Sequence, residues 1–177
     1  MTQADSAPQA AMLEALHARI AVLEAERAVR KTLTRYMALC DVPSGAASGE
    51  SLAALFAEDA IWEGIGPQYA QKFGRLQGQA QIVAMLQRYL PPTAHFTTNV
   101  HFLTAETIEV AGSTAKGRWV MLQASGYVDA QAQLISARLE VEFSPARDGD
   151  QWLIQHFRTE RLFDAPWHVN PRKDTTS

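Results

Sequence analysis

Cysteine is nearly missing from this chain, since Cys40 is the only one among 177 residues. A single cysteine excludes a disulfide framework and a zinc site built from several thiolates, and it is typical of a reducing compartment. Cys40 lies at helical spacing from Leu33 and Met37. We therefore expect a buried, unreactive thiol.

Long apolar runs and basic clusters are missing as well. No run reaches the roughly 20 residues of a membrane-spanning helix, and the N-terminus lacks the basic-then-apolar order of a signal peptide. Sixteen Lys and Arg against nineteen Asp and Glu give a formal charge of -3, without the basic patch that binds phosphates. We expect a cytoplasmic protein that binds neither membrane nor nucleic acid.

The length and the 47% of hydrophobic residues suit one domain with a substantial core. We place this domain at residues 10–164. Residues 1–9 are small and polar and are expected to be disordered. Residues 165–177 form a tail that either covers a pocket or hangs free.

The first helix is expected from Ala10 to about Asp41, where Pro43 disfavours further helical geometry. Its first half carries a heptad-like apolar stripe, hereafter the seam, whose members are spaced three, four and three: Leu13, Leu16, Ile20 and Leu23. Its second half widens into a stripe suited to a sheet. The seam therefore indicates either a homo-oligomer, dimer or trimer, or a helical extension that packs on its own domain.

Helices precede strands in the rest of the chain, which predicts an α+β fold with the helices on one face of an antiparallel sheet. A loop is expected at 66–78 and turns at 111–113 and 147–150. The expected helices are 51–56 and 79–90, and the expected strands are 60–64, 93–102, 106–110, 114–125, 134–143 and 151–163.

The strand expected at 93–102 has one polar face. Alternation with period two places His95, Asn99 and His101 on that face. This face either lines a cavity or meets water.

Several local motifs and their order resemble the SnoaL-like branch of the NTF2-like superfamily. The motifs are Tyr36 with Asp41, Leu52-Ala-Ala-Leu-Phe-Ala-Glu-Asp-Ala-Ile-Trp-Glu63, Gly74-Arg-Leu-Gln-Gly78, His95 with Asn99, Ala111-Gly-Ser-Thr-Ala115, and Trp152-Leu-Ile154. The resemblance spans about residues 23–163.

This resemblance implies a cone-shaped fold, with helices in the concavity of a strongly bent sheet and an apolar pocket at one end. Similar members include scytalone dehydratase, bile acid 7α-dehydratase and lyases that remove formaldehyde from lignin-type compounds. Others are isomerases, cyclases and noncatalytic subunits of ring-hydroxylating dioxygenases. Residue by residue, Tyr36, Asp41 and His95 look like the tyrosine, aspartate and histidine of the dehydratases.

These residue types can carry out acid/base chemistry. An imidazole works near neutral pH as base and then acid when a partner fixes its tautomer. We expect His95 to be the base, Asp41 to orient it, and Tyr36 to bond the substrate oxygen. The expected substrate contacts are Trp62, Phe73, Asn99, His101, Arg118, Trp119 and Arg138.

Neither a metal nor a cofactor is expected, because the six-residue step from His95 to His101 matches no common ligand spacing. The resulting hypothesis is a cofactor-independent lyase. It would remove water, or a small carbonyl fragment such as formaldehyde, from a small hydrophobic aromatic or polycyclic substrate. The alternatives are a noncatalytic ligand-binding or assembly subunit, and an isomerase or cyclase of the same fold.

Overall fold

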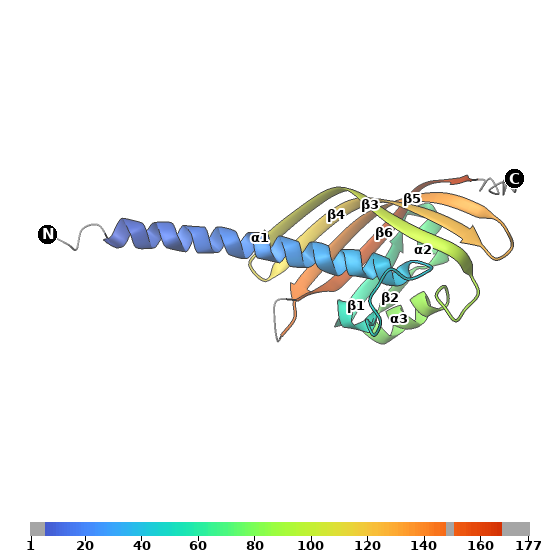
Figure 1. The fold of residues 1–177 in the computed structure, drawn as a ribbon, viewed down its shortest axis with the longest axis horizontal. Coiled ribbons are helices and arrows are strands. Elements are labelled where there is room, and N and C mark those ends of the chain that lie inside the picture. The colour runs from blue at the N-terminus through green and yellow to red at the C-terminus, as the bar shows by residue number, and fades with distance from the viewer. Residues whose placement is uncertain (1–5, 148–150, 168–177) are drawn as a thin grey trace, which may run out of the picture.

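A long helix lies in the hollow of a curved sheet in the computed structural model, which describes residues 6–147 and 151–167. The expected α+β fold with helices in the concavity is confirmed (Figure 1). The helical elements are α1 Ser6–Cys40, the short 3-10 turn η1 Ala53–Leu55, α2 Gly66–Lys72 and α3 Gln79–Gln87.

Six strands form one open sheet in the order β2-β1-β6-β5-β4-β3. Neighbouring strands are antiparallel except for β1 and β6, which run parallel, so the expectation of an antiparallel sheet was incomplete. The strands are β1 Phe56–Ile65, β2 Arg75–Gln77, β3 Phe96–Ala111, β4 Thr114–Tyr127, β5 Ala132–Pro145 and β6 Trp152–Pro166.

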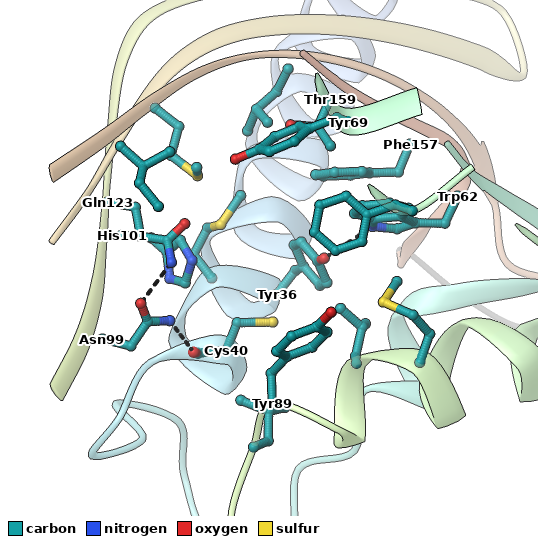
Figure 2. Close-up of a pocket in the computed structure, with 18 of the residues that line it drawn as sticks. Tyr36, Cys40, Trp62, Tyr69, Tyr89, Asn99, His101, Gln123, Phe157 and Thr159 are labelled. Carbon is teal, nitrogen blue, oxygen red and sulfur yellow. Dashed lines mark hydrogen bonds between the residues drawn. The ribbon is translucent and has the colours of Figure 1, made fainter. Parts of the chain in front are cut away.

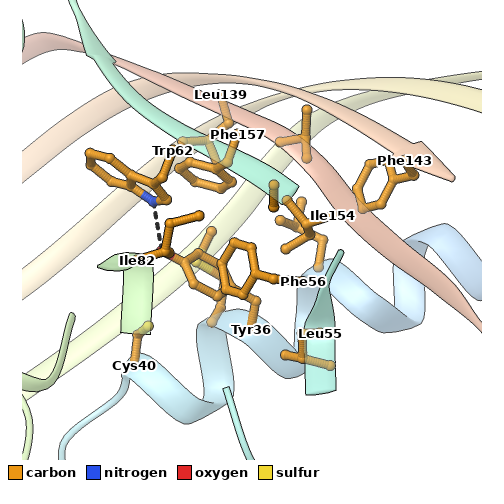
Figure 3. Packing of buried hydrophobic residues seen from close by; sticks show 14 of the residues in the cluster. Tyr36, Cys40, Leu55, Phe56, Trp62, Ile82, Leu139, Phe143, Ile154 and Phe157 are labelled. Atoms are coloured by element: carbon orange, nitrogen blue, oxygen red, sulfur yellow. Dashed lines mark hydrogen bonds between the residues drawn. The ribbon is translucent and has the colours of Figure 1, made fainter. Parts of the chain in front are cut away.

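The core lies between the second half of α1 and the concave face of the sheet. Val29 and Leu33 of α1 are fully buried, and inward-facing residues of β4, β5 and β6 such as Trp119, Leu139 and Ile154 are buried with them. Tyr36 packs edge-on against Phe56, with ring centroids 5.6 Å apart, as Figure 3 shows. The wider apolar stripe of this half is therefore the part of α1 that holds the domain together.

The first half of α1 projects beyond the sheet (Figure 1). The four members of the seam are between 42% and 63% exposed, so the seam does not pack on its own domain. The helix begins at Ser6, inside the segment expected to be disordered. Helix α1 carries charged residues throughout, and no helix of the described chain has the length and apolar character to cross a membrane.

The segment 66–78 was expected to be a loop, but it contains α2 and β2. Helix α2 has Pro67 in its first turn and buries Tyr69, and β2 pairs with β1 through Trp62 and Leu76. Both elements are too short to give a periodic pattern, and the glycines at each end read as loop signals.

Strand β3 starts at Phe96 and continues through the expected break near residue 105. The ladder shifts between Thr104 and Thr107, and Ala105 has a φ of 47° there. The break is therefore an irregularity within one strand. The expected turn at 147–150 and the tail beyond Trp167, including His168, lie largely outside the described residues.

Candidate active site

A cavity of about 230 Å³ lies between the C-terminal half of α1, the short helices and the concave face of the sheet. Most of its wall is apolar or aromatic, as Figure 2 shows. Trp62 and Phe73, both expected to contact substrate, line it, and so does Phe157, which stacks on Trp62 with ring centroids 5.6 Å apart. Polar side chains interrupt this wall at several places, and their arrangement shows what chemistry the cavity can carry out.

Asp41 follows directly after the last residue of α1 and bonds His101 of β3. One carboxylate oxygen, Oδ1, accepts the His101 backbone N–H at 3.0 Å and lies 2.8 Å from ring Nδ1. Because an ionised carboxylate only accepts, Nδ1 carries the ring proton. In the neutral form of this imidazole, the unprotonated nitrogen is then Nε2, which can act as a base.

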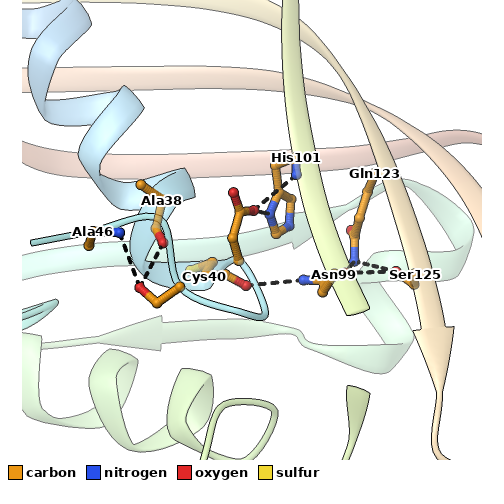
Figure 4. A network of polar contacts seen from close by, with 9 residues as sticks. Ala38, Cys40, Ala46, Asn99, His101, Gln123 and Ser125 are labelled. Atoms are coloured by element: carbon orange, nitrogen blue, oxygen red, sulfur yellow. Dashed lines mark hydrogen bonds and ion pairs between the residues drawn. The ribbon is translucent and has the colours of Figure 1, made fainter. Parts of the chain in front are cut away.

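Asn99 bonds the residues on both sides of Asp41, and Figure 4 shows one of these bonds, from the Asn99 side chain to Cys40. Its side-chain Nδ2 donates to the Cys40 carbonyl at 3.1 Å. Its backbone N–H and C=O bond to Val42 at 2.9 and 2.8 Å. The residues before and after Asp41 are thus both fastened to one buried position of β3, which fixes the carboxylate relative to His101.

Asn99 was expected to bind substrate, but its amide is engaged within the protein. Oδ1 accepts from Gln123 Nε2 at 2.7 Å and from Ser125 Oγ at 2.8 Å. Only 2% of Asn99 is exposed. A network with all its members bonded is rigid, so Asn99 is a positioning residue for Asp41.

Tyr36 projects from α1 into the wall of the cavity and is buried. Its hydroxyl accepts the indole N–H of Trp62 at 3.2 Å, and the Cys40 thiol is a further hydrogen-bond neighbour. Burial raises the pKa of Tyr36 well above its usual value. The hydroxyl therefore stays protonated at neutral pH, so it can act on a substrate as a neutral hydrogen-bond donor but not as an anion.

Cys40 also lines the cavity and is buried, as expected. Burial raises the pKa of its thiol to about 12. The thiol consequently stays protonated and is unsuited to nucleophilic attack.

His95 does not pair with Asp41, so the expected pair of Asp41 and His95 was wrong. It lies one residue ahead of β3, in a turn where its N–H bonds the Thr93 carbonyl at 3.0 Å. Its ring lines the cavity among three aromatic rings, those of Tyr89, Phe96 and Tyr127. Among the residues described here, no carboxylate bonds the ring of His95.

Three of the expected substrate contacts lie away from the cavity. Arg118 and Arg138 point to the outer face of the sheet, because their neighbours in sequence face inward. Arg138 bonds Glu160 there at 2.8 Å. Trp119 is core, with its indole N–H donating to Glu106 at 3.0 Å. None of these three expected substrate contacts therefore lines this cavity.

Sequence reasoning missed other polar residues of the wall. The most important is Arg161, which follows Phe157 and Thr159 at alternate positions on the inward side of β6. That alternation was a readable signal. The others are Tyr69, Lys72, Tyr89, Gln123 and Tyr127.

No group of three His, Cys, Asp or Glu side chains suited to a metal ion occurs within residues 6–147 and 151–167. The polar groups described for this cavity are thus one carboxylate–imidazole pair, the second imidazole of His95, tyrosine hydroxyls, amides and two cations.

The family model of the SnoaL-like domain matches residues 21–158. The chain belongs to the SnoaL-like family. Its match covers the second half of α1, the helices α2 and α3, and the sheet as far as Arg158, so it includes most of the cavity wall. A comparison of the sequence with curated proteins gives no significant match.

Solved structures with the NTF2-like fold resemble this SnoaL-like chain. A hexachlorocyclohexane dehydrochlorinase, LinA type 2, has a TM-score of 0.68 and 19% identity over 85% of this chain and 96% of its own. A scytalone dehydratase-like protein from Novosphingobium aromaticivorans has a TM-score of 0.65 and 19% identity, and the match covers 82% of this chain and 89% of that protein. An NTF2-like protein from the same organism has a TM-score of 0.64 and 25% identity, and the match covers 83% of this chain and 88% of that protein. These likenesses show that the chain shares the fold of these proteins.

Proposed function

We propose that this SnoaL-like protein is a cofactor-independent lyase whose base is His101. Asp41 orients the imidazole, and the Tyr36 hydroxyl bonds the oxygen that leaves or gains charge. The observation that carries this proposal is the 2.8 Å contact between Asp41 Oδ1 and His101 Nδ1 at the wall of an apolar cavity. A base held in one tautomer beside a hydrophobic substrate is what a proton abstraction requires.

In the loss of water, Nε2 of His101 takes the proton from the carbon next to the hydroxylated carbon. The C–H electron pair becomes the new double bond as the C–O bond breaks. The departing hydroxide takes the proton back from the imidazolium and leaves as water, so the histidine is restored. For the loss of formaldehyde, Nε2 takes the hydroxyl proton of a hydroxymethyl group. The C–C bond then breaks, and the carbon left behind takes the proton.

The cavity also bears on the size of the substrate. Its volume of about 230 Å³ lies below the roughly 300–1,000 Å³ of pockets for drug-sized ligands. It favours a compact molecule of one or two rings over the polycyclic substrate that was one of the expectations. The aromatic rings from Trp62, Phe73 and Phe157 would pack on the flat face of such a ring.

The test is a screen of hydroxylated aryl compounds for cofactor-free formation of an alkene or of formaldehyde. We expect product with the purified protein and its loss with His101→Gln, a polar replacement that cannot act as a base. Absorbance follows the alkene, and a colorimetric assay follows the formaldehyde.

His156 provides a matched control for this variant. It bonds Glu63 at 3.0 Å but does not line the cavity, so His156→Gln should keep the activity. Full activity in His101→Gln would overturn the assignment of the base. A screen in which no compound is converted would favour a noncatalytic ligand-binding role.

A second proposal concerns assembly: we infer that two copies of the chain associate through the seam in parallel orientation. The seam is exposed along its length, and its spacing of three, four and three is that of a coiled coil. The residues that flank such a seam set its orientation through interhelical charge pairs.

Those flanking charges favour a parallel arrangement. In parallel helices, a flanking residue faces the residue five positions later in the partner. Arg19 then faces Glu24 of the second copy, and Glu26 faces Lys31. Both pairs are of opposite charge.

Light scattering during size exclusion tests this assembly. We expect a dimer or larger for the unmodified chain and a shift to monomer for Ile20→Glu, which places a charge in the middle of the seam. Val22→Glu, which lies off the seam on the same exposed helix half, is the control. A monomer in the unmodified protein, or an unchanged assembly in Ile20→Glu, would contradict the proposal.

A further inference from the structure

A second polar region of the cavity carries positive charge and has no part in the proton transfer described above. It consists of Arg161 on β6 and Lys72 at the end of α2, beside Tyr69 and Thr159. In Figure 2 the labelled Tyr69 and Thr159 lie above Tyr36, whereas His101 and Asn99 lie to its left. The two cations therefore come from other elements of the wall, β6 and the end of α2, than the β3 imidazole of His101.

Arg161 is poorly compensated for a largely buried cation. Its side chain is only 18% exposed, and the nearest carboxylate oxygen, Asp164 Oδ1, is 3.4 Å from Nη1. Its guanidinium carbon lies 5.4 Å from the ring centroid of Tyr69. Within the described residues its Nε is buried and has no hydrogen-bond partner. Two other arginines share this last feature, but Arg161 is the one that lines the cavity.

Lys72 adds a second positive charge at the rim. Its ammonium lies 5.1 Å from the centroid of the Phe73 ring, and no ion pair to it is found in the described part of the chain. Partial burial lowers the pKa of Lys72, and the charge of Arg161 lowers it further. The two cations are thus close enough to repel each other.

Burying uncompensated charge is costly, and two cations at one wall add mutual repulsion. An anion bound between them would relieve both costs. A guanidinium presents parallel N–H donors that match the two oxygens of a carboxylate, and an ammonium adds a point charge. Asp164 is 36% exposed and supplies one negative charge against two positive ones, so it leaves this end of the cavity positive.

The strand order fixes how far this end lies from the imidazole. His101 is on β3 and Arg161 on β6, three strand steps apart in the sheet. At about 4.8 Å per step, their backbones are separated by roughly 14 Å along the curved surface. Both side chains line the same cavity, so the gap between their polar atoms is shorter than this backbone path.

We propose that the natural ligand of this cavity is a compact aromatic acid whose carboxylate binds between Arg161 and Lys72 while its opposite end lies at His101. The carboxylate and the reacting carbon are on opposite sides of a ring, because adjacent atoms could not reach both ends. This inference rests on the proposed function for the role of His101, but the anion-binding end stands on its own contacts.

Calorimetric titration at neutral pH tests the proposal with a matched pair of compounds. The probes are 4-(1-hydroxyethyl)benzoate and its uncharged primary amide, which have the same shape. We expect the acid to bind about ten-fold more tightly than the amide. Arg161→Met should remove that difference, and Lys72→Met should reduce it by a smaller factor.

Two further variants separate charge from folding. Arg118→Met removes an arginine from the outer face of the sheet and should leave the preference for the acid unchanged. Arg161→Lys keeps the positive charge but lacks the parallel N–H donors of the guanidinium, so it should retain part of the preference for the acid. The thermal midpoint of each variant shows whether it is folded.

Equal binding of acid and amide to the unmodified protein would overturn the proposal. So would no detectable binding of the acid at millimolar concentration, or an unchanged preference in Arg161→Met. If the corresponding phosphonate bound more tightly than the carboxylate, the natural ligand would be of the phosphate type, and the assignment of a carboxylate would be overturned. Selective binding of the acid without turnover of any acid would support this site and contradict the lyase, so the two proposals can fail separately.

Discussion

His101 and His95 line the same cavity, yet the chain treats the two rings differently. His101 bonds the Asp41 carboxylate at 2.8 Å through Nδ1. His95 has ring centroids of Tyr89, Phe96 and Tyr127 at 5.0, 4.4 and 5.6 Å instead. A carboxylate specifies which nitrogen holds the proton, whereas aromatic edges and faces specify only the plane of the ring.

This difference separates two roles that residue type alone cannot separate. A base must present the same unprotonated nitrogen to every substrate molecule, which is what the Asp41 contact provides for His101. A wall residue needs only shape and moderate polarity, which the aromatic surroundings of His95 provide. Asn99 extends the contrast, because it fastens the backbone on both sides of Asp41.

The largest effect is expected from Asp41→Asn. In the structure one oxygen, Oδ1, serves both the His101 backbone N–H and ring Nδ1, so an amide oxygen in that place could keep both contacts. The amide carries no negative charge, however, and therefore stabilises the imidazolium formed on proton transfer far less. We expect kcat to fall by about 10²–10⁴ while the fold is retained. Steady-state kinetics on a substrate from the screen measures this.

Glu63→Gln is the control for Asp41→Asn, since it alters the other carboxylate–histidine contact of the described chain, at 3.0 Å to His156. That contact lies outside the cavity, and we expect kcat to stay within about two-fold of the unmodified protein, because surface pairs contribute little. Near-normal turnover in Asp41→Asn would show that the pair is structural.

The fold could be predicted from the sequence to a large extent. The wide stripe on the second half of α1 and the long strands with short turns specify helices packed on one face of a sheet. The parallel pairing of β1 with β6 could not be predicted, because it joins the first strand to the last and neither carries a local signal of its partner. The prediction missed α2 and β2, because elements this short show no hydrophobic periodicity.

The site was predictable only in part. Alternation placed Asn99 and His101 on one face, but which histidine meets Asp41 depends on where β3 begins and how it pairs with Val42. Alternation counted from the core residues of each strand would have placed Arg118 and Arg138 on the outer face and Arg161 on the cavity face. Side-chain direction on a long strand is thus readable from sequence, whereas contact between a helix end and a strand is not.

A much smaller effect than that of Asp41→Asn is expected from His95→Gln, and it decides the comparison. If His95 is a wall residue, its loss alters packing against substrate, so KM should rise by less than about ten-fold with kcat almost unchanged. Tyr127→Phe, which keeps the ring beside His95 and removes one hydroxyl, should have a still smaller effect on KM. Measurement of kcat and KM for both variants and for Asp41→Asn tests this.

A drop of about a hundred-fold in kcat for His95→Gln, together with only a small drop for Asp41→Asn, would exchange the roles of the two histidines. His95 would then be the base, with its proton position set by substrate, and the bond between Asp41 and His101 would serve only to join the end of α1 to β3.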